Sequence, residues 1–128
     1  MYDKKPTMKA EDTLQAECVR WFRYQYPHIV IFAIPNGGQR NAITGALMKK
    51  TGTLAGVADL FVMKAQPDEL FGLEYYYHGL FIEMKVGKGR QTESQTLFQQ
   101  QAEKAGYRYI VCRTMDEFRH YVQQYIDG

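Results

Sequence analysis

Several kinds of segment are missing from this chain of 128 residues, and each absence excludes a class of protein. Only two cysteines occur, Cys18 and Cys112, and they lack metal-ligand spacing, so we expect neither a disulfide framework nor a zinc site. No apolar run approaches ~18 residues, and the start MYDKKPTMKA lacks the apolar core of a signal peptide. We therefore expect a cytoplasmic, intracellular protein that does not enter the membrane.

The chain also lacks a strong charge of one sign. Sixteen Lys and Arg against fourteen Asp and Glu leave a net charge of +2, which is too small to indicate a nucleic-acid partner by itself. Basic residues nevertheless lie near the glycine-rich segments, namely Arg40, Lys49, Lys50, Lys85, Lys88 and Arg90. Such a cluster is typical of a phosphate-binding face, although a solvated surface of mixed charge explains it equally well.

Internal repeats and low-complexity segments are absent as well. The length fits a single domain on the usual scale of ~100–200 residues, and 45% hydrophobic residues are enough for one core. We expect residues 1–10 to be a flexible N-terminal tail and residues 11–128 to form one domain.

The apolar periodicity predicts an α/β domain. A first helix over 11–27 can be capped by Asp12 or Thr13 and is ended by Pro27. Tyr75–Tyr77 can extend the third strand into a hairpin. The order helix, three strands, helix, strand, helix indicates a central mixed sheet. The strands are expected over 29–34, 59–65, 80–86 and 107–113, the later helices over 93–104 and 114–126, and a short helix over 41–51.

The segment GLFIEMK, residues 79–85, places two charges on a strand that otherwise resembles core. Glu83 and Lys85 project from one face because side chains alternate along a strand. Asp59 opens the preceding strand, so if the two strands are neighbours its carboxylate converges with that of Glu83. Two carboxylates suit Mg²⁺ or Mn²⁺, and an adjacent lysine can orient an attacking water. A simple Glu–Lys ion pair explains the strand without a metal.

Four segments together resemble the VRR-NUC family: IPNGGQR, GTLAGVADLFV, HGLFIEMKVGKGRQTESQ and AGYRYIVCRT. This family is a branch of the PD-(D/E)XK nuclease superfamily, and the similarity runs from about Glu17 to Tyr125. It implies a restriction-endonuclease-like fold, an α/β core with a central mixed four-stranded sheet flanked by helices. It also implies metal-dependent cleavage of DNA phosphodiesters. One departure is Ala58, where the family often has proline.

The resemblance assigns roles to individual residues. Asp59, Glu83 and Lys85 match the catalytic acidic pair and lysine, and Met84 matches a position whose backbone carbonyl binds the metal. Glu17 matches an acidic residue of the first helix that acts on the cation through water, although pairing with Arg20 or with solvent explains it equally well. Gln95 matches a glutamine that follows the lysine motif, but with Thr92 it also has the spacing of a helix capping box.

Further residues of this chain match or surround the family's DNA-contacting loop. Asn36, Gly37, Gly38 and Arg40 lie where free amides and a guanidinium grip a phosphate, and a plain turn accounts for the same residues. Tyr75–Tyr77 can stack on bases, pack against a second copy or form an ordinary hairpin face. The remaining candidates for DNA contact are Lys49, Lys50, Lys88 and Arg90.

The resemblance therefore predicts a Mg²⁺- or Mn²⁺-dependent endodeoxyribonuclease. Small standalone members of the family resemble Holliday junction resolvases of replication and repair, often from phages, so branched DNA and a homodimer are expected. Three alternatives stay open: a nuclease with little structure selectivity, a branched-DNA-binding protein that does not cleave, and an interaction module that binds no nucleic acid. Salt-dependent DNA binding would exclude the last of these.

Overall fold

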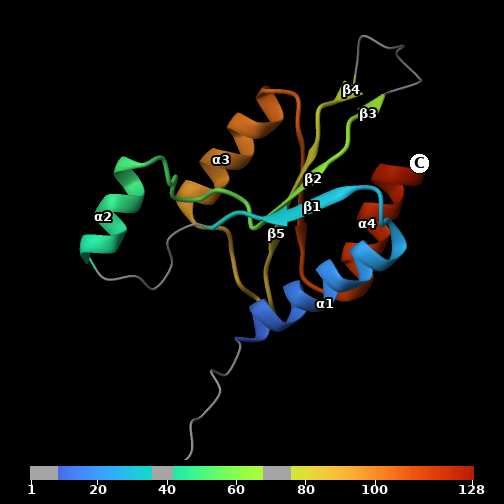
Figure 1. Ribbon diagram of the computed structural model, residues 1–128, viewed down its shortest axis with the longest axis horizontal. Helices are drawn as coiled ribbons and strands as arrows, with labels where there is room; N and C mark the ends of the chain where they lie inside the picture. Colours follow the sequence, from blue (N-terminus) through green and yellow to red (C-terminus); the bar gives the residue numbers. More distant parts are fainter. Residues whose placement is uncertain (1–8, 36–41, 68–75) are drawn as a thin grey trace, which may run out of the picture.

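The computed structural model describes residues 9–35, 42–67 and 76–128 (Figure 1). The loop residues Asn36, Gly38 and Arg40, residue Tyr75 and most of the expected tail lie outside these segments. The elements follow the predicted order. They are α1 (Ala10–Gln25), β1 (Val30–Ala33), α2 (Ala42–Lys50), β2 (Leu60–Met63), β3 (Gln66–Pro67), β4 (Tyr76–Tyr77), β5 (Leu80–Met84), α3 (Glu93–Lys104), β6 (Arg108–Cys112) and α4 (Met115–Asp127).

The central sheet has four strands in the order β1-β2-β5-β6. Both β1–β2 and β2–β5 are antiparallel, whereas β5 and β6 are parallel, so the predicted mixed four-stranded sheet is confirmed. The parallel connection contains α3, as expected for a crossover between parallel strands. Tyr76–Tyr77 does not extend the central sheet but pairs with Gln66–Pro67 in a separate two-stranded sheet.

The two faces of the sheet pack against different helices. On one face, α1 and α4 enclose the larger core, which contains Cys18, Phe22, Ile82, Met84 and Phe118 among others. On the other face, α3 packs Ala102 and Phe98 against Ala58, Phe81 and Tyr109. Helices on both faces of a largely covered sheet give the three-layer α/β arrangement. Alternation along β5 therefore turns Ile82 and Met84 toward the larger core and Glu83 toward the α3 side.

The start of α1 differs from the prediction. The predicted cap of α1 at Asp12 or Thr13 is wrong: the helix begins at Ala10 after Lys9, whose side chain makes no capping hydrogen bond. Asp12 therefore lies within the first turn, where a negative charge is favourable.

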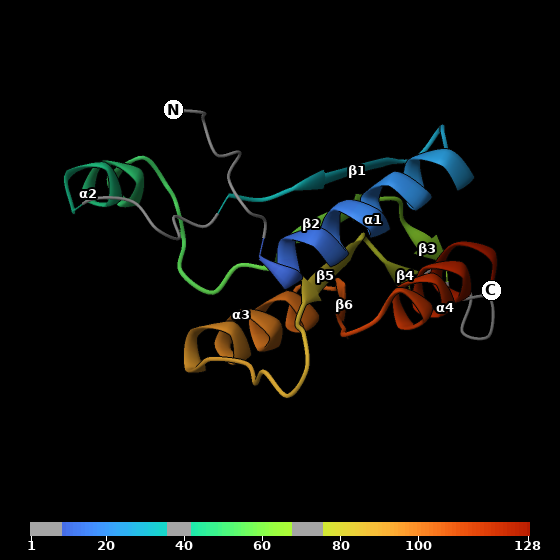
Figure 2. The same ribbon diagram turned by 90° about the horizontal axis from the view of Figure 1, so that it is seen from below.

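Helix α2 stands apart from the sheet in Figures 1 and 2, and its Leu47 is 60% exposed. Within the described segments, no helix has the length and apolar character needed to cross a membrane.

Candidate active site

The strand register brings the two predicted acidic residues face to face. Leu60 of β2 pairs with Ile82 of antiparallel β5. Continuing this register by one residue places Asp59 opposite Glu83, on the same face of the sheet. The Oδ2 atom of Asp59 accepts a hydrogen bond from the backbone N–H of Met84 at 2.7 Å, which fixes its carboxylate at this strand end.

The turn before Asp59 is held against the start of α3. Gly56 has a φ of +85°, and a β-carbon there would lie only 2.4 Å from the carbonyl carbon of Ser94. Any other residue would therefore both strain the backbone and clash with α3. This close approach places the start of α3 beside the strand end that carries Asp59.

Lys85 joins the site to α3 through Gln95. Its Nζ donates to Gln95 Oε1 at 2.9 Å and lies 3.8 Å from Glu83 Oε2. Gln95 also completes the capping box with Thr92, because its Oε1 accepts from the Thr92 N–H at 2.8 Å while the Thr92 hydroxyl accepts from the Gln95 N–H. The capping box is thus confirmed, and the same side chain holds the lysine, while the functional role of Gln95 stays a prediction.

Glu83 is almost completely buried, with 1% of its surface exposed. Its Oε1 accepts from the Tyr109 hydroxyl and, at 3.4 Å, from Gln91 Nε2. Its Oε2 makes no hydrogen bond to any residue that the structure describes. A buried carboxylate oxygen without a hydrogen-bond donor is costly, and among the described residues this atom has only the ion pair with Lys85 at 3.8 Å.

Two glutamates of the first helix have different surroundings. Glu17 is exposed and lines a surface groove with Trp21, Tyr24 and Met115, and its predicted role stays a prediction. Glu11 lies six residues earlier, and its carboxyl interacts electrostatically with Asp59, Lys85 and Glu83. Burial, followed by repulsion from Asp59, raises the pKa of Glu11. Glu11 therefore belongs to this charge cluster, and its neighbour Asp12 repels both Glu11 and Asp59.

Burial also raises the pKa of the central aspartate. For Asp59 the loss of hydration is the largest cause, and the negative charge of Glu83 adds to it. The hydrogen bond from Met84 N–H and the charge of Lys85 oppose this shift without cancelling it. Three carboxylates close to a single ammonium form a site whose negative charge is incompletely balanced by the described side chains.

Three site residues were missed by the sequence interpretation. Glu11 lies on the same helical stripe as Leu14 and Cys18, so an acidic residue one turn before a buried stripe was a usable signal. Tyr109 and Gln91 contact Glu83 only because β6 is parallel to β5 and the loop before α3 folds back over it. No sequence spacing encodes that contact directly.

The residues fit a divalent cation held by few protein ligands. Within the described segments, no three His, Cys, Asp or Glu side chains are grouped to hold a metal by themselves. Mg²⁺ usually takes one or two carboxylates and completes its shell with water and substrate phosphate. Asp59 and Oε2 of Glu83, which accepts no hydrogen bond from a described residue, supply such a pair. The predicted ligand role of the Met84 carbonyl stays a prediction, as does the identity of the ion.

The predicted DNA-contacting residues surround the site only in part. Lys88 and Arg90 are exposed in the loop between β5 and α3, and in the sequence they lie between the site residues Lys85 and Gln91. Lys49 and Lys50 are exposed at the end of α2, which stands apart from the sheet. A separate groove of about 610 Å³ begins at Asp12, beside Glu11, and follows α1 past Arg20 to Ala33.

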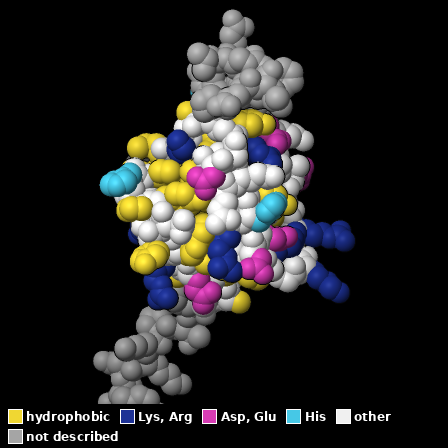
Figure 3. All heavy atoms as spheres, turned by 90° about the vertical axis from the view of Figure 1, so that its right-hand side faces the viewer, with side chains coloured by type: hydrophobic (Ala, Val, Ile, Leu, Met, Phe, Trp, Pro, Cys, Tyr) yellow, Lys and Arg dark blue, Asp and Glu magenta, His cyan; other side chains and the backbone are white. Residues whose placement is uncertain are grey.

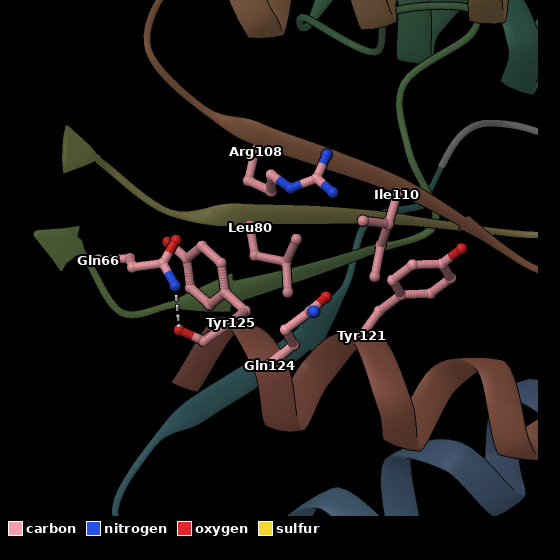
Figure 4. A pocket seen from close by; sticks show the side chains of 7 residues that line it. All are labelled: Gln66, Leu80, Arg108, Ile110, Tyr121, Gln124 and Tyr125. Atoms are coloured by element: carbon pink, nitrogen blue, oxygen red, sulfur yellow. Dashed lines mark hydrogen bonds between the residues drawn. The ribbon is translucent and has the colours of Figure 1, made fainter. Parts of the chain in front are cut away.

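A second pocket in the described part of the chain differs in chemistry from the site. A pocket of about 190 Å³ lies between α4 and the first residues of β5 and β6, at the ends of these strands away from the site. There Gln66 Nε2 donates to the Tyr125 carbonyl at 2.7 Å (Figure 4). It is lined by Gln66, Leu80, Arg108, Ile110, Tyr121, Gln124 and Tyr125, and no carboxylate is among them. On the face shown in Figure 3, acidic and basic side chains are interspersed with apolar ones.

Comparison with known proteins agrees with this geometry. A solved structure described as a VRR_NUC domain protein superimposes with a TM-score of 0.71 at 26% identity, covering 95% of this chain and 92% of that one. No match was found among curated proteins. The sequence profile of the VRR-NUC domain matches residues 8–116 and so includes Glu11, Asp59, Glu83 and Lys85. The chain therefore belongs to the VRR-NUC family and is a nuclease-type domain.

Proposed function

We propose that this protein is a Mg²⁺- or Mn²⁺-dependent DNA endonuclease that prefers branched substrates such as four-way junctions. The observation that supports the proposal most directly is the meeting of two partly or fully buried carboxylates at neighbouring strand ends, one of them with an oxygen that accepts no hydrogen bond from a described residue. A stable fold has no need for this arrangement, because it places negative charges together at the edge of the core.

Each residue then has a role in phosphodiester hydrolysis. Asp59 and Glu83 hold the cation, which when bound neutralises phosphate charge and makes water more acidic. Lys85, fixed by Gln95, is placed to orient the attacking water and to stabilise negative charge at phosphorus. Glu11 holds water at the edge of the site. The new bond joins the water oxygen to phosphorus, and the bond from phosphorus to the 3′-oxygen breaks, leaving a 5′-phosphate and a 3′-hydroxyl.

The preference for branched DNA is proposed together with a homodimer. A four-way junction has two-fold symmetry, and a two-fold dimer presents two active sites to it. Apolar side chains are available for such an interface on β1 and α2, where Val30, Phe32 and Leu47 are 48%, 41% and 60% exposed. A light-scattering mass of one chain at micromolar concentration would contradict the dimer.

Cleavage assays test the function. Labelled four-way junction, flap and linear duplex DNA are incubated with Mg²⁺, Mn²⁺ or EDTA, using wild-type protein and Lys85→Ala. We expect paired symmetric cuts in the junction that are lost in EDTA and reduced by at least about a hundredfold in the variant. Equal cutting of all three substrates would remove the junction preference while keeping the nuclease. Junction binding without cutting would point to a scaffold protein and would contradict the proposal.

The loop between β5 and α3 is the proposed DNA contact nearest to the site. Replacing both Lys88 and Arg90 by alanine should weaken DNA binding and reduce the slope of log affinity against log salt by up to about two, one unit for each lost phosphate contact. Lys104→Ala is the matched control, because Lys104 is an exposed lysine at the other end of α3, about 18 Å along the helix axis. Equal salt slopes for all three proteins would exclude this loop as a phosphate contact.

A further inference from the structure

The two oxygens of the Glu83 carboxylate have different environments. Oε1 is engaged by two donors, the hydroxyl of Tyr109 and Nε2 of Gln91. Oε2 accepts no hydrogen bond from the described residues and forms an ion pair with Lys85 Nζ at 3.8 Å. If protein donors only replaced the water that this carboxylate lost on burial, both of its oxygens would accept hydrogen bonds. The asymmetry therefore calls for a separate explanation.

The donors to Oε1 come from rigid parts of the fold. Tyr109 lies within β6, only 2% exposed, and its ring packs against Phe98 of α3. The parallel register pairs Glu83 with Val111, so Tyr109 lies two residues earlier on the same face of the sheet. Its hydroxyl is thus fixed beside Glu83 by the strand that carries it.

Gln91 is fixed by α3 and lies beside the Tyr109 hydroxyl, 3.5 Å from its Nε2. Its Nε2 donates to Gln99 Oε1 at 2.9 Å as well as to Glu83 Oε1. Gln99 lies within α3, two turns after the capping box that begins the helix. The loop residue is therefore attached to the same helix that positions Lys85 through Gln95.

We propose that Tyr109 and Gln91 are positioning residues that occupy Oε1 of Glu83, so that this carboxylate offers Oε2 alone to the divalent cation. The inference rests on the proposed function of the site and adds how one ligand binds: through one oxygen, with the other engaged by the protein. Hydrogen-bonded partners of metal ligands orient them and typically change metal affinity 10–100-fold when removed. These two hydrogen bonds to Oε1, called the clamp below, also prevent the carboxylate from turning both oxygens toward the ion.

A metal-binding measurement without DNA tests the clamp. Wild type and Tyr109→Phe are titrated with Mn²⁺ by isothermal calorimetry, and the affinity of the variant should fall about tenfold. In cleavage assays, the loss of activity should be recovered at high Mn²⁺, so that the apparent metal constant rises while the rate at saturating metal stays close to wild type. A general loss of structure would not produce this separation.

Tyr125→Phe is a matched control. Tyr125 is also a buried tyrosine, 5% exposed, and its hydroxyl donates to the Lys64 carbonyl at 2.7 Å, at the opposite end of the sheet. Both variants lose one hydroxyl and the hydrogen bond that it donates, and Tyr109→Phe also loses the long contact from Gln91 Nε2 at 3.5 Å. Only Tyr109→Phe should weaken Mn²⁺ binding, and an equal fall in both variants would overturn the proposal.

Gln91→Leu provides a second variant should Tyr109→Phe not fold. Its side chain keeps a similar volume but donates nothing to Glu83, so Mn²⁺ affinity should again decrease. Unchanged affinity in whichever folded variant is measured would overturn the clamp while leaving the proposed nuclease intact. Absence of Mn²⁺ binding and cleavage in the wild type would instead overturn the proposed function together with the clamp.

Discussion

The two ends of strand β5 differ in how the polar groups beside them are hydrogen-bonded. At its start, near Leu80, two hydrogen bonds pair polar groups beside the pocket: Tyr125 donates to the Lys64 carbonyl at 2.7 Å and Gln66 donates to the Tyr125 carbonyl at 2.7 Å. At its end, Glu83 is buried opposite Asp59, and one of its oxygens accepts no hydrogen bond from a described residue. One end contributes to stability, whereas the other concentrates charge at the expense of stability, which is typical of a functional site.

The largest expected effect comes from removing the charge of Asp59, which faces Glu83 at the active-site end of the sheet. Asp59→Asn should reduce cleavage by at least about a thousandfold, because a cation ligand is worth several kcal/mol in the transition state. Asparagine keeps an oxygen that can accept the hydrogen bond from Met84 N–H, so the fold is retained.

The same variant should unfold at a higher temperature than wild type in EDTA. Burial raises the pKa of Asp59, which means that its charged form is disfavoured in the metal-free fold. Thermal unfolding measured by circular dichroism in EDTA checks this. A lower melting temperature for Asp59→Asn would show that the carboxylate is a stabilising group, and the contrast between the two ends of β5 would then disappear.

The next effect separates the two glutamates of α1. Glu11→Gln should reduce cleavage about 10–100-fold, as expected for a group that supports a metal site from its edge. Glu17→Gln should leave cleavage within about twofold of wild type, because Glu17 lies in a surface groove with Trp21 and Tyr24. Rates measured at saturating Mn²⁺ with the same junction compare the two. The reverse order would restore Glu17 as the functional acid.

The glutamate comparison shows where sequence reasoning reaches its limit. The alternation in GLFIEMK and the position of Asp59 after its turn were enough to predict the carboxylate pair, because strand periodicity determines which side chains share a face. The apolar stripe of α1 places Cys18 in the core, with Leu14 packed against it. The stripe does not indicate which end of the helix meets the sheet edge, so it does not show that Glu11 lies near the carboxylate pair.

Contacts across the sheet were beyond the sequence for a related reason. Tyr109 reaches Glu83 through the parallel register of β5 and β6, and nothing local to either strand specifies that register. The capping box of Thr92 and Gln95, by contrast, is local and was predicted correctly. The grip of Gln95 on Lys85 follows only when α3 is docked beside the strand end.

A smaller effect is expected at the paired end of β5. Tyr125→Phe removes the hydrogen bond to the Lys64 carbonyl and should lower the free energy of unfolding by about 1 kcal/mol. For a domain of this size that corresponds to a melting temperature lower by about 3–5 °C. Cleavage should not change. A loss of cleavage without a loss of stability would show that the two ends of β5 are coupled.

The smallest effect concerns buried ionisable groups that carry no charge. Cys112 pairs with Met84 at the same end of the sheet as the active site, but it faces the larger core together with Cys18. Burial raises the pKa of Cys18 to about 11 and that of Cys112 to about 12, so both thiols stay protonated at neutral pH. Unlike the carboxylates, they remain neutral and therefore do not destabilise the core.

These thiols should be unreactive toward Ellman's reagent in the native protein at pH 8 and fully reactive in denaturant, since the thiolate is the nucleophile. Because the folded pKa values lie above the unfolded value of about 9, the folded state binds more protons between pH 9 and pH 12. The contribution of the thiols to the free energy of unfolding should thus be constant below pH 9 and decrease above it. Cys112→Ser, whose hydroxyl does not titrate there, should show a shallower decrease in chemical denaturation from pH 8 to pH 10.5. An identical decrease in both proteins would mean that the alkaline loss of stability originates elsewhere, and the contrast between charged and neutral burial would then rest on the carboxylates alone.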